Sequence, residues 1–200
     1  MMNSMKKGLL ALTLASTLVF SGCGYNTLQA KDESVTAAWS EVENQYQRRA
    51  DLVPNLVNVV KGYATHEEKV LTEVTEARAN VAGLKVDKEV LNDPELFKKY
   101  QEAQSQMTGA LSRLLAVTEN YPDLKANEQF RDLQVQLEGT ENRISTARTR
   151  YVESVQDYNT YVRQFPQAMT AKVIGMKAKP NFSAEAGAAK APTVNFNQSN

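Results

Sequence analysis

The chain has little of the chemistry on which most enzymes and metal proteins depend. Its 200 residues include one cysteine, one histidine and one tryptophan. The histidine, His66, is followed by two glutamates, but Val70 stands where a His-Glu-x-x-His zinc motif needs its second histidine. The sequence also lacks a Gly-x-Ser-x-Gly elbow and a glycine-rich phosphate loop. We therefore expect no catalytic residues, no metal site and no cofactor.

Signals for β-strands and an excess of charge of one sign are missing as well. The sequence has no Asn-Gly or Asp-Gly turn and no run in which Val, Ile or Thr alternates with polar residues, so strands are not expected. The formal net charge is +0, and basic and acidic residues are interspersed along the chain. A nucleic-acid-binding protein needs a concentrated basic face, so we expect no nucleic-acid partner.

The N-terminus has the pattern of an export signal. Lys6 and Lys7 precede a run from residue 8 to residue 20 without one charge. As a helix this run would extend about 20 Å, which is short of a bilayer's hydrocarbon core. That length is typical of the apolar part of a signal peptide.

The run ends in Phe20-Ser21-Gly22-Cys23, which resembles a bacterial lipobox. As the only cysteine, Cys23 has no intramolecular disulfide partner, and attached lipid would remove a free thiol from an oxidising compartment. We predict a signal peptide at residues 1–22, lipid on Cys23, and a short tether over residues 23–31. The protein would then be anchored to a membrane on its extracytoplasmic side. A cleaved signal with a chance cysteine and an uncleaved single-pass N-terminal anchor remain the alternatives.

Apolar residues recur at helical spacing through most of the remaining chain. For the first helix the series is Val35, Trp39, Val42, Tyr46, Val53, Leu56 and Val60, continued by Tyr63, Val70, Val74, Ala77 and Val81; for the second it is Leu96, Tyr100, Ala103, Met107, Leu111 and Leu114; and for the third it is Phe130, Leu133, Leu137, Ile144, Tyr151, Val155, Tyr158, Val162 and Phe165. They predict an all-α fold, an elongated antiparallel up-and-down bundle of three long helices over residues 32–166. Asp93 and Asn127 mark the starts of the second and third helices. For residues 167–200 we predict a short helix, followed beyond Lys179 by a flexible tail.

Residues 47–56 are the most unusual stretch, because they combine guanidinium groups, an acid, an amide and a proline inside a helical pattern. Pro54 lacks a backbone donor, so we expect the first helix to be kinked or divided there, which would make the core resemble a four-helix bundle. Arg49, Asp51, Pro54 and Asn55 have two interpretations. They form a structural kink whose freed carbonyls are satisfied by Arg49 or Asn55, with Asp51 as a cap, or they form a site at which a partner docks.

The ordered motifs of the chain resemble the LemA family of bacterial envelope proteins. The motifs are Tyr25-Asn26-x-Leu28, Val35-x-x-x-Trp39, Tyr46-Gln47-x-Arg49-x-Asp51-Leu52-Val53-Pro54-Asn55-Leu56-Val57, Ala77-Arg78, Glu141-Asn142-Arg143-Ile144, Ala147-Arg148-x-x-Tyr151, Tyr158-Asn159 and Phe165-Pro166. The chain departs from the family at Val152, commonly Asn, and in a weak phenylalanine-rich segment after Gly175, which bears on C-terminal docking. The resemblance implies a helical bundle outside a membrane and brings no established enzymatic activity.

Three functions follow as hypotheses. The first is a non-enzymatic scaffold or adaptor for membrane or envelope protein partners. The second is a binding module for a small envelope ligand, held near Pro54 or among the tyrosines. The third is a hydrolase that uses carboxylate pairs such as Glu138 and Glu141, which would need a shared cleft.

Overall fold

The computed structural model describes residues 2–84 and 88–183, with side chains from Gly24 onward except that of Lys88. This part of the chain is helical and contains no strand, which confirms the predicted all-α class. The elements are α1 (Met2–Lys61), α2 (Glu68–Gly83), a 3-10 turn (Lys88–Leu91), α3 (Pro94–Thr118), α4 (Pro122–Ala126), α5 (Glu128–Arg163) and α6 (Gln167–Val173).

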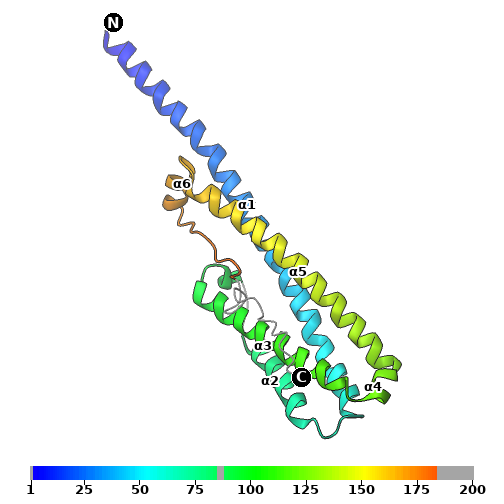
Figure 1. Ribbon diagram of the computed structural model, residues 1–200. Coiled ribbons are helices and arrows are strands. Elements are labelled where there is room, and N and C mark those ends of the chain that lie inside the picture. The colour runs from blue at the N-terminus through cyan, green and yellow to red at the C-terminus, as the bar shows by residue number, and fades with distance from the viewer. Residues whose placement is uncertain (1, 85–87, 184–200) are drawn as a thin grey trace, which may run out of the picture.

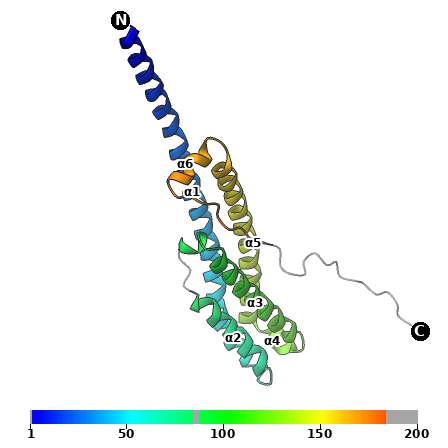
Figure 2. The same ribbon diagram turned by 90° about the vertical axis from the view of Figure 1, so that its left-hand side faces the viewer.

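Two antiparallel helix pairs build an elongated molecule. The long helices α1 and α5 lie side by side, and the hairpin of α2 and α3 packs against the half of α1 that is farther from its N-terminus (Figure 1). Figure 2 shows that the first turns of α1 project beyond the bundle as a single helix and that α6 lies at the end where α1 emerges. One end of the rod is therefore defined by the N-terminal segment, and the other by the turns around α4.

Local capping sets the starts of α3 and α5 as predicted. The Asp93 carboxylate accepts hydrogen bonds from the backbone N–H groups of Glu95 and Leu96 at 2.9 and 3.1 Å. The Asn127 side chain accepts one from the N–H of Phe130 at 2.9 Å. Each cap satisfies donors that the first turn of a helix leaves without a partner.

The first helix is not divided where the sequence predicted. α1 passes through Pro54 without interruption, and the chain leaves the helix only after Lys61, at Gly62. Glycine in a helix interior costs about 1 kcal/mol relative to alanine, so Gly62 is a favourable place for α1 to end. Of the two outcomes expected at Pro54, a kink or a division, the division is wrong, because the carbonyl that the proline leaves unpaired has another donor, described below.

The predicted tether is also absent. Residues 24–31 continue α1, and Leu28 is fully buried in the bundle. Leu28 lies seven residues before Val35, which lies seven before Val42, so the buried seam begins within the segment assigned to the tether. The bundle thus begins only a few residues after Cys23. The side chain of Cys23 itself lies outside the part of the chain that the structure describes.

The interior consists of two apolar cores along the rod. The core nearer the N-terminal end is rich in aromatic rings, with Trp39 packed against Phe97, Tyr100 and Tyr151 at centroid distances of 5.3–5.7 Å. The far core is mainly aliphatic and includes Val53, Leu56, Val60, Val74, Met107, Leu111, Leu114, Leu124 and Leu137. Trp39 and its neighbouring tyrosines therefore fill the core.

The chain after α6 does not become a free tail at Lys179. Asn159 on α5 donates to the backbone carbonyl of Lys179 at 2.9 Å and accepts from its N–H at 2.8 Å. The Lys179 ammonium pairs with Asp32 at 2.9 Å. Phe182 then enters the aromatic core with the Arg148 guanidinium 4.3 Å from its ring centroid. The predicted tail is therefore wrong through residue 183, and residues 184–200 lie outside the described residues.

Candidate functional site

A buried arginine separates the two apolar cores. Arg49 on α1 is 2% exposed, between Tyr46 of the aromatic core and Val53 of the aliphatic core. It occupies the same seam as Val42 and Leu56, each seven residues away. A fully buried cation is costly unless charged and hydrogen-bonding partners surround it. The partners of Arg49 therefore define the candidate site.

Helices α3 and α5 supply the partners of Arg49. Its Nη1 donates to the Thr108 hydroxyl and to the Glu141 carboxylate, both at 2.8 Å. Its Nη2 donates to the backbone and side-chain carbonyls of Gln104 at 3.2 and 2.5 Å. The guanidinium also lies 5.2 Å from the centroid of the Tyr46 ring. One side chain thus joins three helices at the middle of the rod.

The charge of Arg49 is balanced by the carboxylate of Glu141 on α5. The side chain of Glu141 is 38% exposed, so the ion pair runs from the interior to the surface. Nε of Arg49 is buried and has no hydrogen-bond partner within the described structure. The arrangement fixes the registers of α1, α3 and α5 relative to one another.

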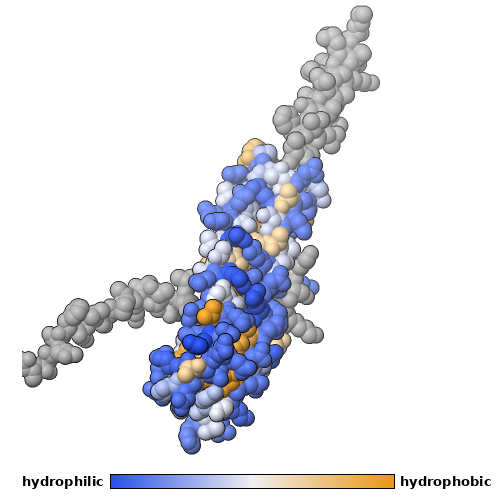
Figure 3. Space-filling model, turned by 90° about the vertical axis from the view of Figure 1, so that its right-hand side faces the viewer, coloured by the Kyte–Doolittle hydropathy of each residue, from blue (hydrophilic) through white to orange (hydrophobic). Residues whose placement is uncertain are grey.

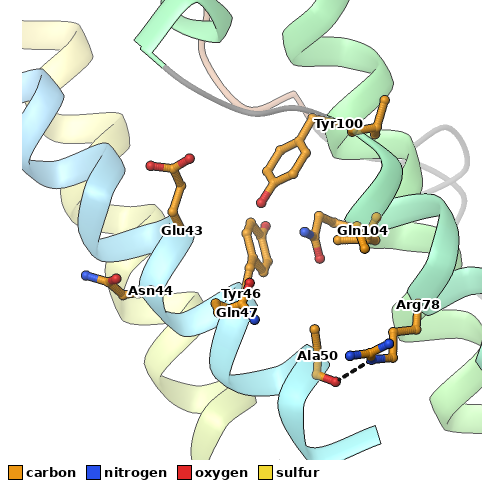
Figure 4. Close-up of a pocket in the computed structure, with 11 residues that line it drawn as sticks. Glu43, Asn44, Tyr46, Gln47, Ala50, Arg78, Tyr100 and Gln104 are labelled. Carbon is orange, nitrogen blue, oxygen red and sulfur yellow. Dashed lines mark hydrogen bonds between the residues drawn. The ribbon is translucent and has the colours of Figure 1, made fainter. Parts of the chain in front are cut away.

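Pro54 is accommodated by an arginine from another helix. A proline cannot donate to the carbonyl four residues earlier, which here belongs to Ala50. Nε of Arg78 on α2 donates to that oxygen at 3.0 Å. This bond, drawn as a dashed line in Figure 4, attaches α2 to α1. The freed carbonyl is thus satisfied by Arg78, and the prediction that Arg49 or Asn55 would satisfy it was wrong.

Arg49 lies apart from the other three residues singled out in the sequence. Asp51, Pro54 and Asn55 are exposed, whereas Arg49 is buried. Asp51 accepts a hydrogen bond from Gln47 one turn earlier at 2.8 Å and does not cap a second helix. Because successive helical residues are about 100° apart around the axis, neighbours in sequence point to different faces.

A cavity of about 350 Å³ lies between α1, α2 and α3, beside the layer that contains Arg49. In Figure 4 the hydroxyl end of Tyr100 points towards Tyr46, with Gln104 on the α3 side, and the two tyrosine rings pack edge to face at a centroid distance of 5.8 Å. Burial raises the pKa of Tyr100, and the Gln104 amide beside it opposes the rise. Tyr100 therefore stays neutral at physiological pH and offers the cavity a hydroxyl. The complete lining is Glu43, Asn44, Tyr46, Gln47, Ala50, Arg78, Val81, Ala82, Leu84, Tyr100 and Gln104.

The remaining candidates from the sequence have ordinary surroundings. His66 is exposed in the turn between α1 and α2. Glu73 binds Arg113 at 3.0 Å, so it and Glu141 are each paired with an arginine. The described residues contain no group of three or more His, Cys, Asp or Glu side chains placed to hold a metal ion. Across those residues, no helix combines the length and the apolar character needed to cross a membrane.

Sequence reasoning missed Gln104, Thr108 and Arg78 as functional neighbours of the unusual stretch. A signal existed for Gln104, since it lies at seven-residue spacing between Phe97 and Leu111 on the buried seam of α3. A polar residue at such a position indicates a buried polar contact. Arg78 belongs to the Ala77-Arg78 motif of the family resemblance, but its role could not be inferred from sequence, because its partner is a backbone atom 28 residues away.

Comparison with known proteins places these residues in a family. A model of the LemA family matches residues 38–196. Similar proteins include Magnetosome protein MamQ 2 from Paramagnetospirillum magneticum, 26% identical over 176 residues, and Magnetosome protein MamQ from Magnetospirillum gryphiswaldense, 24% identical over 174 residues. Each alignment covers 79% of this chain and 64% of the relative, so the chain spans less than two thirds of these relatives.

Proposed function

Because the chain belongs to the LemA family, we propose that it is a non-enzymatic envelope protein, anchored to a membrane, whose helical rod acts as a scaffold for membrane partners. The family and the MamQ relatives support a membrane-associated role without enzymatic activity.

The continuity of α1 is the observation that carries this proposal. The helix α1 runs without a break from the residue after Cys23 to Lys61, so the proposed anchor site and the bundle are joined by one continuous element. From Gly24 to Lys61 this helix is about 57 Å long at 1.5 Å per residue. Arg49 joins it to α3 and α5 at mid-length, which favours a rod that moves as one unit. A scaffold of this kind would hold its far end at a set height above the bilayer.

The proposed anchor is lipid on Cys23, on the extracytoplasmic side of the membrane. The charged residues Lys6 and Lys7, the uncharged run 8–20 and the small residues before Cys23 support it. An uncleaved N-terminal segment is the alternative anchor. Incorporation of labelled palmitate that is lost in Cys23→Ser, together with the mass of the mature N-terminus, separates the two.

Site-specific photo-crosslinking in intact cells tests the scaffold role. A photo-reactive amino acid at Tyr63, which is 43% exposed near the far end, should give a discrete adduct with a membrane protein. The same probe in a Cys23→Ser chain should give much less of that adduct, because the rod would no longer be held at the membrane. A probe at Val135, exposed on the side of α5, serves as the matched control. If photo-reactive probes at all the exposed positions give no discrete adduct, the proposal is overturned.

The cavity between α1, α2 and α3 favours a second candidate, a binding module for a small envelope ligand. Its volume of about 350 Å³ and its carboxylate, amide and guanidinium lining suit a small polar molecule. Native mass spectrometry of the protein isolated from membranes should then show a bound small mass, and Ala82→Trp, which narrows the cavity, should remove it. A bare protein mass in both samples would rule this candidate out.

A further inference from the structure

Exposed apolar side chains gather at one end of the molecule. Among the described side chains, seven large hydrophobic ones are exposed, and four of these lie between residues 165 and 174. Phe165 is 83% exposed, Met169 65%, Val173 86% and Ile174 37%. Elsewhere the surface is mostly hydrophilic, with apolar side chains in small separate spots, as the side seen in Figure 3 shows. Such a local concentration indicates a contact surface.

The helix α6 is fixed to the bundle by its opposite side. Ala171 is 1% exposed and belongs to the aromatic core. The N–H of Met176 donates to the carbonyl of Ala171 at 2.9 Å and closes the turn after the helix. Met169 and Val173 are four residues apart and therefore lie on one face. This face is firmly positioned and points away from the core.

The position of α6 identifies what covers this face. An ideal Cβ on Gly24 would lie 3.8 Å from Cγ of Gln167, so the start of α6 touches α1 one residue after Cys23. The chain that continues from there towards the N-terminus is the uncharged run 8–20. Figures 1 and 2 agree that α6 lies at the end of the bundle from which this segment emerges. A membrane that holds lipidated Cys23, or the run 8–20 as an uncleaved anchor, would therefore lie next to the exposed face.

The charges around the face favour an anionic surface. Residues 163–183 contain four basic side chains and no acidic one. Arg163, Lys172 and Lys177 are exposed, whereas Lys179 is paired with Asp32. Asp157 on the same end of α5 is paired with Lys31. Apolar side chains with basic neighbours are the composition of helices that lie in the headgroup region of anionic bilayers.

We propose that Phe165, Met169, Val173 and Ile174, flanked by Arg163, Lys172 and Lys177, form a membrane-docking face that inserts into the headgroup region of the anchoring bilayer. The inference rests on the proposed N-terminal anchorage. It adds a second contact with the lipid, off the axis of α1. Two contacts fix the tilt and rotation of the rod, whereas an anchor alone leaves both free.

Fluorescence quenching by lipid tests the face on the full chain. Phe165→Trp and Val173→Trp place a tryptophan on the face, and Val135→Trp places one on α5, about 42 Å before the end of that helix at Arg163. Val135 is 68% exposed, which makes it a matched control. Each variant is reconstituted in phosphatidylglycerol-containing vesicles with and without brominated acyl chains. The native Trp39 is buried and contributes equally to all samples.

Quenching of the tryptophans at positions 165 and 173, but not at 135, is the expected result. Lys172→Glu combined with Lys177→Glu should reduce this quenching in anionic vesicles and leave circular dichroism unchanged. A chain that floats with the vesicles but shows no quenching at 165 or 173 overturns the docking face and leaves the anchor intact. A chain that does not float with the vesicles overturns both. If a second copy or another protein covers the face, the chain would float with the vesicles and show no quenching at 165 or 173.

Discussion

Removal of the Glu141 carboxylate should destabilise the protein more than removal of the arginine it neutralises. Glu141→Ala leaves Arg49 buried with only the neutral acceptors of Gln104 and Thr108. Breaking a buried ion pair in this way costs about 3–5 kcal/mol. The carboxylate is 38% exposed and partly screened by solvent, so we expect a loss of about 2–3 kcal/mol in the free energy of unfolding.

Replacement of the cation itself should cost less. Arg49→Met keeps a long apolar chain in the seam and leaves Glu141 free to be hydrated. Thr108 keeps a partner, because its hydroxyl also donates to the carbonyl of Gln104 at 3.1 Å. The remaining cost is an unpaired Gln104 side-chain oxygen, about 1–2 kcal/mol. The variant that carries both Arg49→Met and Glu141→Ala should be about as stable as Arg49→Met alone. The coupling free energy between the two residues is then about 2 kcal/mol.

Wild type, the two single variants and the double variant form a double-mutant cycle. Their unfolding by urea in mild detergent is monitored by far-ultraviolet circular dichroism. At about 2–4 °C per kcal/mol for a chain of this size, Glu141→Ala should lower Tm by about 4–12 °C. Glu138→Ala, an exposed residue of α5 hydrogen-bonded to Gln134, is the control and should stay within about 0.5 kcal/mol of wild type. The reasoning is refuted if the coupling is below about 0.5 kcal/mol or if Arg49→Met is the more harmful change.

Three further outcomes follow from the same contacts. Arg78→Ala should cost about 1–2 kcal/mol by urea unfolding, and less in a Pro54→Ala background, where the helix supplies its own donor. Asn159→Ala should speed amide hydrogen exchange in residues 177–183, because both of its bonds to that segment are lost. Burial, with Asp32 as a further cause, raises the pKa of Tyr158 from its ordinary value of 10.0 to about 12. The neutral Tyr158 phenol therefore contributes its full stabilisation of the folded state below pH 10, and this contribution is lost towards pH 12. Tyr158→Phe should show a shallower fall in the free energy of unfolding between pH 10 and pH 12.

Each of these measurements has a result that would contradict it. Equal losses for Arg78→Ala with and without Pro54 would show that Arg78 does not replace the missing donor. Unchanged exchange after Asn159→Ala would mean that Phe182 and Lys179 hold the segment without it. An equally steep alkaline decline in Tyr158→Phe would assign the titration to other groups.

Local patterns were sufficient for the helices and insufficient for the contacts between them. The caps at Asp93 and Asn127 and the spacing of apolar residues act within one or two turns, so they can be read directly from neighbours in the sequence. The tether was mispredicted although Leu28 continues the seven-residue spacing of Val35 and Val42. The same spacing includes Arg49, and a search for apolar residues alone passes over a cation at a core position.

The sequence by itself determined an all-helical rod with a signal-like N-terminus, because propensity, periodicity and capping are properties of short segments. Only the tertiary structure decided that α1 continues through Pro54, since the replacement donor comes from Arg78 on another helix. It also decided that Arg49 is neutralised by Glu141, 92 residues away, and that residues 177–183 return to the bundle at Asn159. These contacts depend on side chains that meet only after the helices have packed, and no local pattern encodes which distant partner will be there.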